Sequence, residues 1–201
     1  KGTNKKNMIY DSIIDLIGNT PLVRLHKIEE EIHTDNQIYA KLEKQNPAGS
    51  IKDRAVISML WDFQKRGLLH KGSTIVEPTS GNTGIAVAAL GNYYGYHIVI
   101  VMPATMSEQR KQLIKAYSAE LVLVDGGMPE AIAKAREILK EVPGSLMLSQ
   151  FDNPANPAAH YIYTGKEILT DLPDVAYVLA GIGTGGTISG IGHYLKEHKS
   201  H

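Results

Sequence analysis

Short apolar runs alternate along this chain of 201 residues with longer stretches in which apolar residues recur every three or four positions. The short runs are typical of buried strands and the longer stretches of amphipathic helices. The pattern predicts strands at 37–43, 74–77, 97–102, 120–124, 145–148 and 175–180, and helices at 51–66, 83–94, 107–117, 129–141, 158–170 and 187–197. This alternation predicts an α/β fold, with a parallel sheet and helices on both of its faces.

One lysine, Lys52, is predicted just inside the start of the helix at 51–66. Residues 46–49, Asn-Pro-Ala-Gly, are typical of a turn, Ser50 of an N-cap, and Asp53 resembles the acid of a capping box. The positive end of the helix dipole disfavours the ammonium form of a lysine in the first turn. Because a neutral amine can attack an aldehyde, Lys52 is a candidate nucleophile. The alternative is that Lys52 is an ordinary exposed lysine on a helix face. Its position in the sequence, taken alone, favours this alternative.

A second segment, Glu77-Pro-Thr-Ser-Gly-Asn-Thr-Gly84, follows a predicted strand and begins a predicted helix. Its polar side chains, on Thr79, Ser80, Asn82 and Thr83, lie next to the unpaired N–H groups of a helix start. Capping a helix requires only one such side chain. The surplus predicts a binding site for a carboxylate, with an ordinary capped turn as the alternative.

A third loop, Gly181-Ile-Gly-Thr-Gly-Gly-Thr187, also lies between a predicted strand and a predicted helix. Glycines let backbone N–H groups approach a phosphate, and the helix dipole favours the anion. The loop matches the dinucleotide pattern G-x-G-x-x-G through Gly181, Gly183 and Gly186. That pattern requires an acidic residue about 20 positions later, and the chain ends before it. The loop therefore favours a monophosphate over a dinucleotide.

The composition narrows the class of ligand. Basic and acidic residues balance at 21 each, so we expect no nucleic-acid or membrane partner and a small molecule as the ligand. The chain has no cysteine, which excludes thiolate metal sites, and His193, His198 and His201 do not share one helix face, so no metal site is predicted. Residues 1–10 lack a hydrophobic signal region, which predicts a cytoplasmic location.

A reactive lysine, a carboxylate loop and a monophosphate loop together predict pyridoxal 5′-phosphate bound with an amino-acid substrate. The same motifs carry a resemblance to a known family. The sequence motifs are Gly18-Asn-Thr-Pro-Leu-Val-Arg-Leu25, Ser50-Ile-Lys-Asp-Arg54, the segment 77–84, Met102-Pro-Ala-Thr-Met-Ser107, Gln150-Phe-Asp-Asn-Pro-Ala-Asn-Pro157 and Gly183-Thr-Gly-Gly-Thr187. Over nearly its whole length the chain resembles the family of cysteine synthases (O-acetylserine sulfhydrylases) and cystathionine β-synthases.

The resemblance implies the fold-type II arrangement of pyridoxal-phosphate enzymes, with two open, mostly parallel sheets and flanking helices. It implies a small mobile α/β domain at 45–150, and a larger cofactor-binding domain to which 1–44 and 151–201 contribute. The two Asn-Pro pairs within 151–157 agree with a domain seam there. Members of this family continue beyond the glycine-rich loop. The resemblance therefore implies a chain truncated in the C-terminal part of the large domain, which leaves the activity of a 201-residue form open.

The resemblance also assigns roles by position. It makes Lys52 the Schiff-base lysine and the base that removes the substrate α-proton, and Asn82 the partner of the cofactor ring hydroxyl. The phosphate-binding loop is Gly183, Thr184, Gly185, Gly186 and Thr187. The residues that receive the substrate carboxylate are Thr79, Ser80, Gly81, Thr83 and Gln150. Lys166 departs from the family pattern, because a proline is common there in cysteine synthases, and we expect it near the surface.

The implied activity is a β-replacement that forms L-cysteine from O-acetyl-L-serine and sulfide. Within the same chemistry, the alternatives are a cystathionine β-synthase that uses serine and a thiol, and a cysteine lyase that releases sulfide. A cofactor-binding fragment without turnover and a nicotinamide dehydrogenase are alternatives from other classes. The resemblance further implies a homodimer and, by analogy, serine acetyltransferase as a partner.

Overall fold

The computed structural model describes residues 9–199. In chain order the elements are η1 (Ile13–Leu16), β1 (Leu22–Arg24), α1 (His26–Glu31), β2 (Tyr39–Lys41), η2 (Glu43–Gln45), α2 (Lys52–Lys65), β3 (Thr74–Pro78), α3 (Asn82–Tyr93), β4 (His97–Pro103), α4 (Glu108–Ala116), β5 (Glu120–Val124), α5 (Met128–Glu141), α6 (Ala155–Ala159), η3 (His160–Gly165), α7 (Lys166–Asp171) and α8 (Gly186–His198). Most of the polar stretch 1–10 lies outside the described residues, and so does His201.

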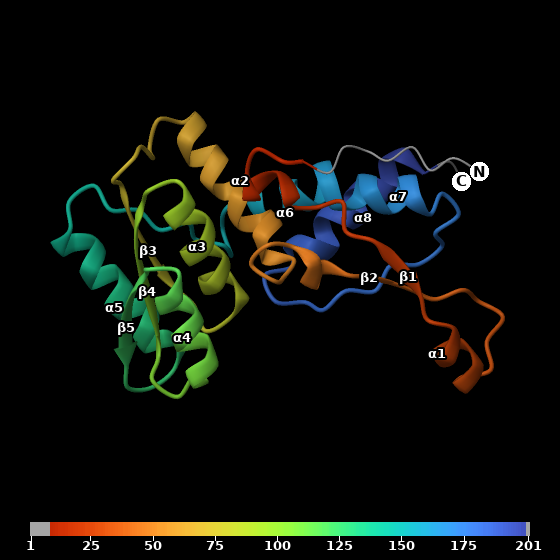
Figure 1. Ribbon diagram of the computed structural model, residues 1–201, viewed down its shortest axis with the longest axis horizontal. Coiled ribbons are helices and arrows are strands. Elements are labelled where there is room, and N and C mark those ends of the chain that lie inside the picture. The colour runs from red at the N-terminus through yellow and green to blue at the C-terminus, as the bar shows by residue number, and fades with distance from the viewer. Residues whose placement is uncertain (1–8, 200–201) are drawn as a thin grey trace.

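These elements form two groups (Figure 1). One group contains β3, β4 and β5 with α3, α4 and α5, and the other contains β1, β2, α6, α7 and α8. Helix α2 lies between the groups and packs against both α3 and α6. Within residues 9–199, no helix combines the length and the apolar character that crossing a bilayer requires.

The strands β3, β4 and β5 form a parallel sheet in that order. Successive side chains of a strand point to opposite faces, so the apolar residues of each strand divide between two cores. Ile75 and Ile100 lie in the core with α2 and α3, whereas Val76, Val99 and Val101 pack with the helix α5. Burial on both faces explains why these strands are almost continuously apolar.

The predicted α/β class is confirmed, and most predicted elements form where expected. Helices α2, α3, α4, α5 and α8 and strands β3, β4 and β5 begin and end within one residue of their predicted limits. The ends are marked by residues that stop a helix. Gly67 and Gly95, with φ of 70° and 73°, follow α2 and α3 in the left-handed conformation that glycine adopts easily.

The predicted helix at 158–170 is a composite of three pieces. It begins earlier than predicted, with α6 after Pro154, and continues through the π-helical turn η3 into α7. Proline fits a helix start because its missing N–H has no partner there in any case. Within the π turn, His160 and Thr164 are buried and their side chains are in contact, with Nδ1 and Oγ1 3.0 Å apart. Turns of this kind are frequent at functional sites.

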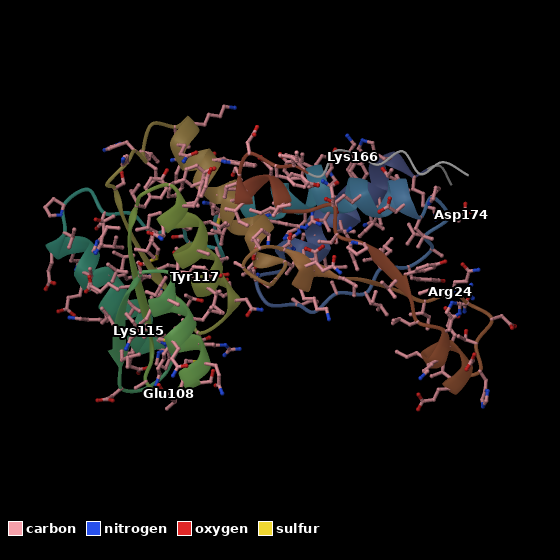
Figure 2. All side chains as sticks on the ribbon, in the orientation of Figure 1. Arg24, Glu108, Lys115, Tyr117, Lys166 and Asp174 are labelled. Atoms are coloured by element: carbon pink, nitrogen blue, oxygen red, sulfur yellow. The ribbon has the colours of Figure 1, made fainter. Side chains whose placement is uncertain are left out.

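The strand predicted at 37–43 is shorter than expected, and it pairs with an element that was not predicted. Leu22 lies opposite Lys41 in a two-stranded antiparallel sheet of β1 and β2. The following helix, α1, was not predicted either, because strands of three residues and helices of six show too little periodicity. Arg24, labelled in Figure 2, binds Glu29 of α1 at 3.1 Å and joins the two elements.

Two further predicted strands are wrong as continuous elements. Within 145–148, only Leu146 pairs, through an isolated parallel bridge to Ile75. Residues 175–180 form no strand, and the Tyr177 side chain is 90% exposed. A strand is stable only beside a hydrogen-bonded neighbour, and none of the strands in the described part of the chain lies alongside 175–180.

A buried guanidinium connects helix α2 to two other segments. Arg54 is 2% exposed and donates two hydrogen bonds to the Glu43 carboxylate and two to the Glu167 carboxylate, at 2.7–2.9 Å. The Lys41 ammonium binds Glu167 at 2.8 Å, and the Asn19 N–H donates to the same carboxylate at 2.9 Å. Two cations and two carboxylates therefore balance in a largely buried cluster, which we call the Arg54 cluster.

We expect Arg54→Met to lower the free energy of unfolding by about 3–5 kcal/mol, because it leaves two carboxylates buried without their cation. Urea unfolding followed by circular dichroism measures the change. Arg66→Gln is the matched control, since Arg66 pairs with Asp62 at 3.2 Å with its side chain 58% exposed. Exposed pairs contribute at most about 1 kcal/mol, so equal losses in the two variants would contradict the role of Arg54.

The same cluster should make stability depend on pH through Glu167. Burial alone would raise the pKa of this carboxyl, but hydrogen bonds from Arg54 and Lys41 lower the pKa to about 2, well below the ordinary value of a glutamate. Because the folded value lies below the unfolded one, this contribution is complete above the unfolded pKa and is lost as pH falls toward 2. The urea concentration at the unfolding midpoint should therefore decrease as pH falls through this window. The decrease should be less steep in Glu167→Gln than in the parent protein. Equal slopes for the two proteins would refute this prediction.

Candidate active site

Lys52 is the first residue of α2, and a hydrogen-bonded turn fixes it there. The Ser50 hydroxyl accepts a hydrogen bond from the Lys52 N–H at 3.1 Å, and the Asp53 carboxylate accepts one from the Ala48 N–H at 2.5 Å. Gly49 has φ of 87°, which allows the chain to turn before the helix. Since Ser50 and Asp53 are both buried, this turn is held from the interior of the protein.

The Lys52 side chain is half-buried, and this burial lowers its pKa from the ordinary value of a lysine. Removing an ammonium group from water disfavours its charged form, and the positive end of the helix dipole acts in the same direction. A larger fraction of the amine is therefore neutral at a given pH. A neutral amine can act as a nucleophile or a base, so the geometry suits the role predicted for Lys52.

The loop between β3 and α3 places two threonines beneath the surface. Thr79 and Thr83 are 3% and 4% exposed, and Thr79 Oγ1 accepts a hydrogen bond from the Gly81 N–H at 3.3 Å. The Thr83 hydroxyl donates to Gln150 Oε1 at 2.6 Å, across 67 positions of the chain. The structure therefore brings Gln150 to the loop that contains Thr79 and Thr83.

The remaining residues of this loop lie at its rim. The Ser80 carbonyl accepts a hydrogen bond from Arg110 at 3.1 Å, and Asn82 is an exposed residue at the start of α3. Gly84 is required by packing, because a Cβ there would lie 2.7 Å from the Thr79 methyl group. The start of α3 can therefore lie directly against Thr79, next to the N–H groups that a carboxylate would bind.

The glycine-rich loop leads into the start of α8. Gly185 has φ of 81°, and Gly186 is the first residue of the helix. A Cβ on Gly186 would lie 2.4 Å from Asn156 Oδ1, so only glycine allows this approach. The Gly186 N–H donates to Thr184 Oγ1 at 3.3 Å, and the N–H groups that follow have no partner within the helix. With 13 residues of helix behind them, these donors fit a phosphate.

The side chain of Asn156 connects Gln150 to the glycine-rich loop. Asn156 Nδ2 donates to the Gln150 carbonyl and to Thr184 Oγ1, both at 2.9 Å. Its Oδ1 is buried and has no hydrogen-bond partner among the described residues. Gln150, Asn156, Thr184, Gly185 and Gly186 line one cavity of about 140 Å³. The residues predicted for the substrate carboxylate and those predicted for the phosphate are therefore contiguous.

A buried histidine lies beneath the glycine-rich loop. His160 Nδ1 is 3.0 Å from Thr164 Oγ1, and its Nε2 is 3.4 Å from the hydroxyl of Thr187. Burial, together with the positive charges of Arg54 and Lys52, lowers the pKa of His160 to about 4. The ring is therefore neutral near pH 7, with one nitrogen as donor and the other as acceptor. It supports Thr187 from the interior side of the loop.

The sequence interpretation missed Asn156 and His160. Asn156 belongs to the two Asn-Pro pairs of 151–157, which indicated only a domain seam. Its partners, Gln150 and Thr184, are 6 and 28 positions away, and no local pattern predicts the second contact. The one local signal that could have suggested Asn156 is an amide side chain in the first turn of a helix.

Other predicted residues are not brought into the same cavity. Neither Lys52 nor Asn82 lines the space around Gln150. A larger hollow of about 600 Å³, between η1, α2 and α7, contains none of the predicted site residues. Lys166 lines that hollow and is exposed, as predicted; Figure 2 labels it at the start of α7.

Comparisons with known proteins identify the family of this chain. The model of the family "Pyridoxal-phosphate dependent enzyme" matches residues 13–201. A cysteine synthase from Flavobacterium sp. (strain K3-15) is 47% identical over 193 residues, which cover 94% of this chain and 62% of that protein. Cystathionine beta-synthase from Saccharomyces cerevisiae is 46% identical over 198 residues, covering 92% of this chain and 39% of that protein.

Solved structures give the same result. A cysteine synthase from Entamoeba histolytica superposes with a TM-score of 0.92 at 42% identity, over 99% of this chain and 60% of that one. A hydrogen sulfide-producing enzyme from Fusobacterium nucleatum gives 0.90 at 45% identity, over 94% and 62%. The chain thus spans about three-fifths of the length of most of these relatives. With the family match extending over residues 13–201, the chain belongs to the pyridoxal-phosphate dependent enzymes.

Proposed function

We propose that the chain carries out a pyridoxal-phosphate-dependent β-replacement that forms L-cysteine and acetate from O-acetyl-L-serine and sulfide. The observation that carries this proposal is the half-buried Lys52 at a helix start, with its pKa lowered by burial. Relatives named cysteine synthase, at 47% and 48% identity, support the choice of reaction. The hydrogen bond between Thr83 and Gln150 supports an amino acid as the substrate.

The residues of the glycine-rich loop fit the cofactor phosphate. The first-turn N–H groups of α8, with the hydroxyl groups of Thr184 and Thr187, would bind its oxygens, and Gly186 lets the backbone approach. Asn82, at the start of α3, would bind the cofactor ring hydroxyl, as the family pattern implies. When bound, pyridoxal phosphate supplies an aldehyde for a lysine amine and a ring that accepts the electron pair from the substrate α-carbon.

The side chains of this chain would then divide the remaining tasks. Thr79, Thr83 and Gln150, with the N–H groups at the start of α3, would bind the substrate carboxylate and orient the amino acid. Lys52 Nζ, in its neutral form, would take the α-proton, acetate would leave the β-carbon with the bonding electrons, hydrosulfide would form the new C–S bond, and Lys52 would return a proton to the α-carbon. Ser80 and Gly81 would contribute to the carboxylate site from its rim.

We also propose the domain division that the family pattern implies. Residues 45–150 would form a small domain that closes over the substrate, and 1–44 with 151–201 would belong to the larger cofactor-binding domain. Closure would exclude water from the site and so strengthen its charge interactions. The link from Thr83 ends at Gln150, the last residue of the small domain, and Asn156 of the larger domain donates to the Gln150 carbonyl across the boundary, which supports coupling of substrate binding to closure. A homodimer, serine acetyltransferase as a partner and a cytoplasmic location remain predictions from the resemblance and the sequence.

A second reaction of the same chemistry is the main competitor. The yeast relative is named cystathionine beta-synthase, and a similar structure is titled a hydrogen sulfide-producing enzyme. Three parallel assays separate the reactions: O-acetylserine with sulfide, serine with homocysteine, and cysteine alone. Cysteine formation should be the fastest of the three. Faster formation of cystathionine or faster release of sulfide from cysteine would replace the proposed reaction, and no turnover with bound cofactor would identify a cofactor-binding fragment.

We expect borohydride reduction in the presence of pyridoxal phosphate, followed by peptide mapping, to place the pyridoxyl group on Lys52. Lys52→Ala should keep phosphate-dependent binding of the cofactor and lose turnover by about 10²–10⁴-fold, the usual contribution of a positioned base. Lys44→Ala is the control, because Lys44 is an exposed lysine on the neighbouring turn η2. Label on another lysine, or equal turnover in the two variants, would overturn the assignment.

We expect Thr83→Val to weaken binding of O-acetylserine by about 1.5–3 kcal/mol, because it removes the hydroxyl that holds Gln150 Oε1 and so orients the Gln150 NH₂ group toward the substrate carboxylate. Spectral titration of the cofactor-loaded protein with amino acid measures this loss. Thr170→Val is the control, since Thr170 is exposed on α7 and its hydroxyl donates only to the Lys166 carbonyl at 2.8 Å. If Thr83→Val titrates like the parent, the proposed carboxylate site is wrong.

A further inference from the structure

Glu77 is a buried acid with no cationic partner among the residues that the structure describes. It lies in β3, two positions before Thr79, and is 2% exposed. Burying a carboxylate away from cations is costly, so such a group is retained only where its hydrogen bonds are specific. The role of this side chain is not explained by the core, because an apolar residue would fill the same space at lower cost.

The carboxylate faces the backbone of the segment that carries Gln150. Glu77 Oε2 accepts a hydrogen bond from the Leu148 N–H at 3.0 Å, in a contact that spans 71 positions of the chain. Burial raises the pKa of Glu77 to about 7, against the effect of the N–H groups of Leu148, Ser149 and Gln150, which each lower it. The hydrogen bond from the Leu148 N–H therefore ties the carboxylate to the backbone two positions before Gln150.

The backbone directly after this hydrogen bond has an unusual conformation. Ser149 has φ of 55°, in the left-handed region that residues other than glycine rarely adopt. This conformation has an energetic cost that surrounding contacts must offset. The hydrogen bond from the Leu148 N–H to Glu77 fixes the residue directly before Ser149, so it is one of the contacts that hold Ser149 in this conformation.

The position of the Gln150 side chain follows from this arrangement. Gln150 comes directly after Ser149, and its Oε1 accepts the hydrogen bond from Thr83 at 2.6 Å. Its carbonyl accepts from Asn156, which also binds Thr184 of the glycine-rich loop. The Glu77 side chain therefore binds the backbone that leads to Gln150, and it has no hydrogen bond to the side chains of Thr83, Gln150 or Thr184 among the described residues.

We propose that Glu77 is a positioning residue, whose carboxylate holds the backbone of 148–150 so that Gln150 lies against Thr83 in the substrate-carboxylate site. This inference rests on the function proposed above, since it gives the carboxylate site a determinant that does not touch the substrate. A merely structural role, in which Glu77 only joins β3 to the segment 145–148, is the competing explanation. The two differ in whether the effect of Glu77 passes through Gln150.

The first test is a double-mutant cycle with O-acetylserine. Glu77→Gln keeps the shape of the side chain but turns one acceptor into an NH₂ donor that faces N–H groups. It should raise KM about tenfold or more while kcat changes less than about twofold, as expected for a lost hydrogen bond to a charged group. In the Gln150→Ala background the same substitution should have no further effect on KM. An undiminished effect in that background would establish the structural role and overturn the proposal.

The second test needs no substrate, so it separates this inference from the proposed function. In the ¹H–¹⁵N spectrum, the side-chain amide of Gln150, assigned through Gln150→Ala, should shift in Thr83→Val. In Glu77→Gln that sensitivity to Thr83→Val should disappear, and the backbone N–H groups of Ser149 and Gln150 should exchange faster with deuterium. Persistent sensitivity and unchanged exchange would refute the proposal, whatever the outcome of the activity assays.

Two further variants keep the tests decisive. Glu29→Gln is the matched control, because Glu29 is 7% exposed in α1, bound to Arg24, and it should leave the Gln150 amide unchanged. Glu77→Asp keeps the charge on a shorter side chain, so it should change KM and the Gln150 amide in the same direction as Glu77→Gln but by less. If Glu77→Gln does not fold, the measurements on Glu77→Asp provide the test. Equal responses in Glu77→Asp and the parent protein would count against the proposal.

Discussion

The buried guanidinium of Arg54 is the interaction on which the position of Lys52, the lysine proposed to react, depends. A buried cation of this kind is tolerated only when carboxylates surround it with good geometry, and here two carboxylates bind it bidentately. One comes from the turn after β2 and the other from α7, so the requirement for charge neutrality fixes three segments at once. Lys52 lies only two positions before Arg54 in the same helix, and the first turn of α2 cannot shift without breaking these bonds.

The same charges control the neighbouring ionisable groups. His160 is buried near Arg54 and Lys52, and it is neutral because a third cation there would face two others in a poorly hydrated space. The Lys52 amine is moved toward its neutral form by the same lack of water. Burial therefore acts in one direction on both bases, which lowers the number of positive charges that the interior must accommodate and leaves a hydrogen-bonding imidazole beneath the glycine-rich loop.

Much of the fold could be predicted from the sequence, because long helices and the buried strands β3, β4 and β5 have periodic patterns and end at glycines or prolines. Short elements without a pattern, such as β1 and α1, could not. The strand expected at 175–180 shows a second limit, since an apolar run forms a strand only where a neighbour is present to pair with it. For the site, the loops were predictable from their own composition. Asn156 and Glu77 were not, because their decisive contacts span 28 and 71 positions of the chain.

Three helix starts supply the chemistry of the proposed site, and one physical property serves all of them. The N-terminal end of a helix carries partial positive charge and free N–H groups, which at α3 and α8 favour a carboxylate and a phosphate. At α2 the same charge acts on a lysine instead, and there it disfavours the ammonium form. In the proposed site, the orientation that would attract the anionic groups of cofactor and substrate is thus also the orientation that favours the neutral form of the amine. The contacts from Thr83 through Gln150 and Asn156 to Thr184 then set the distance between the two anion-binding helix starts.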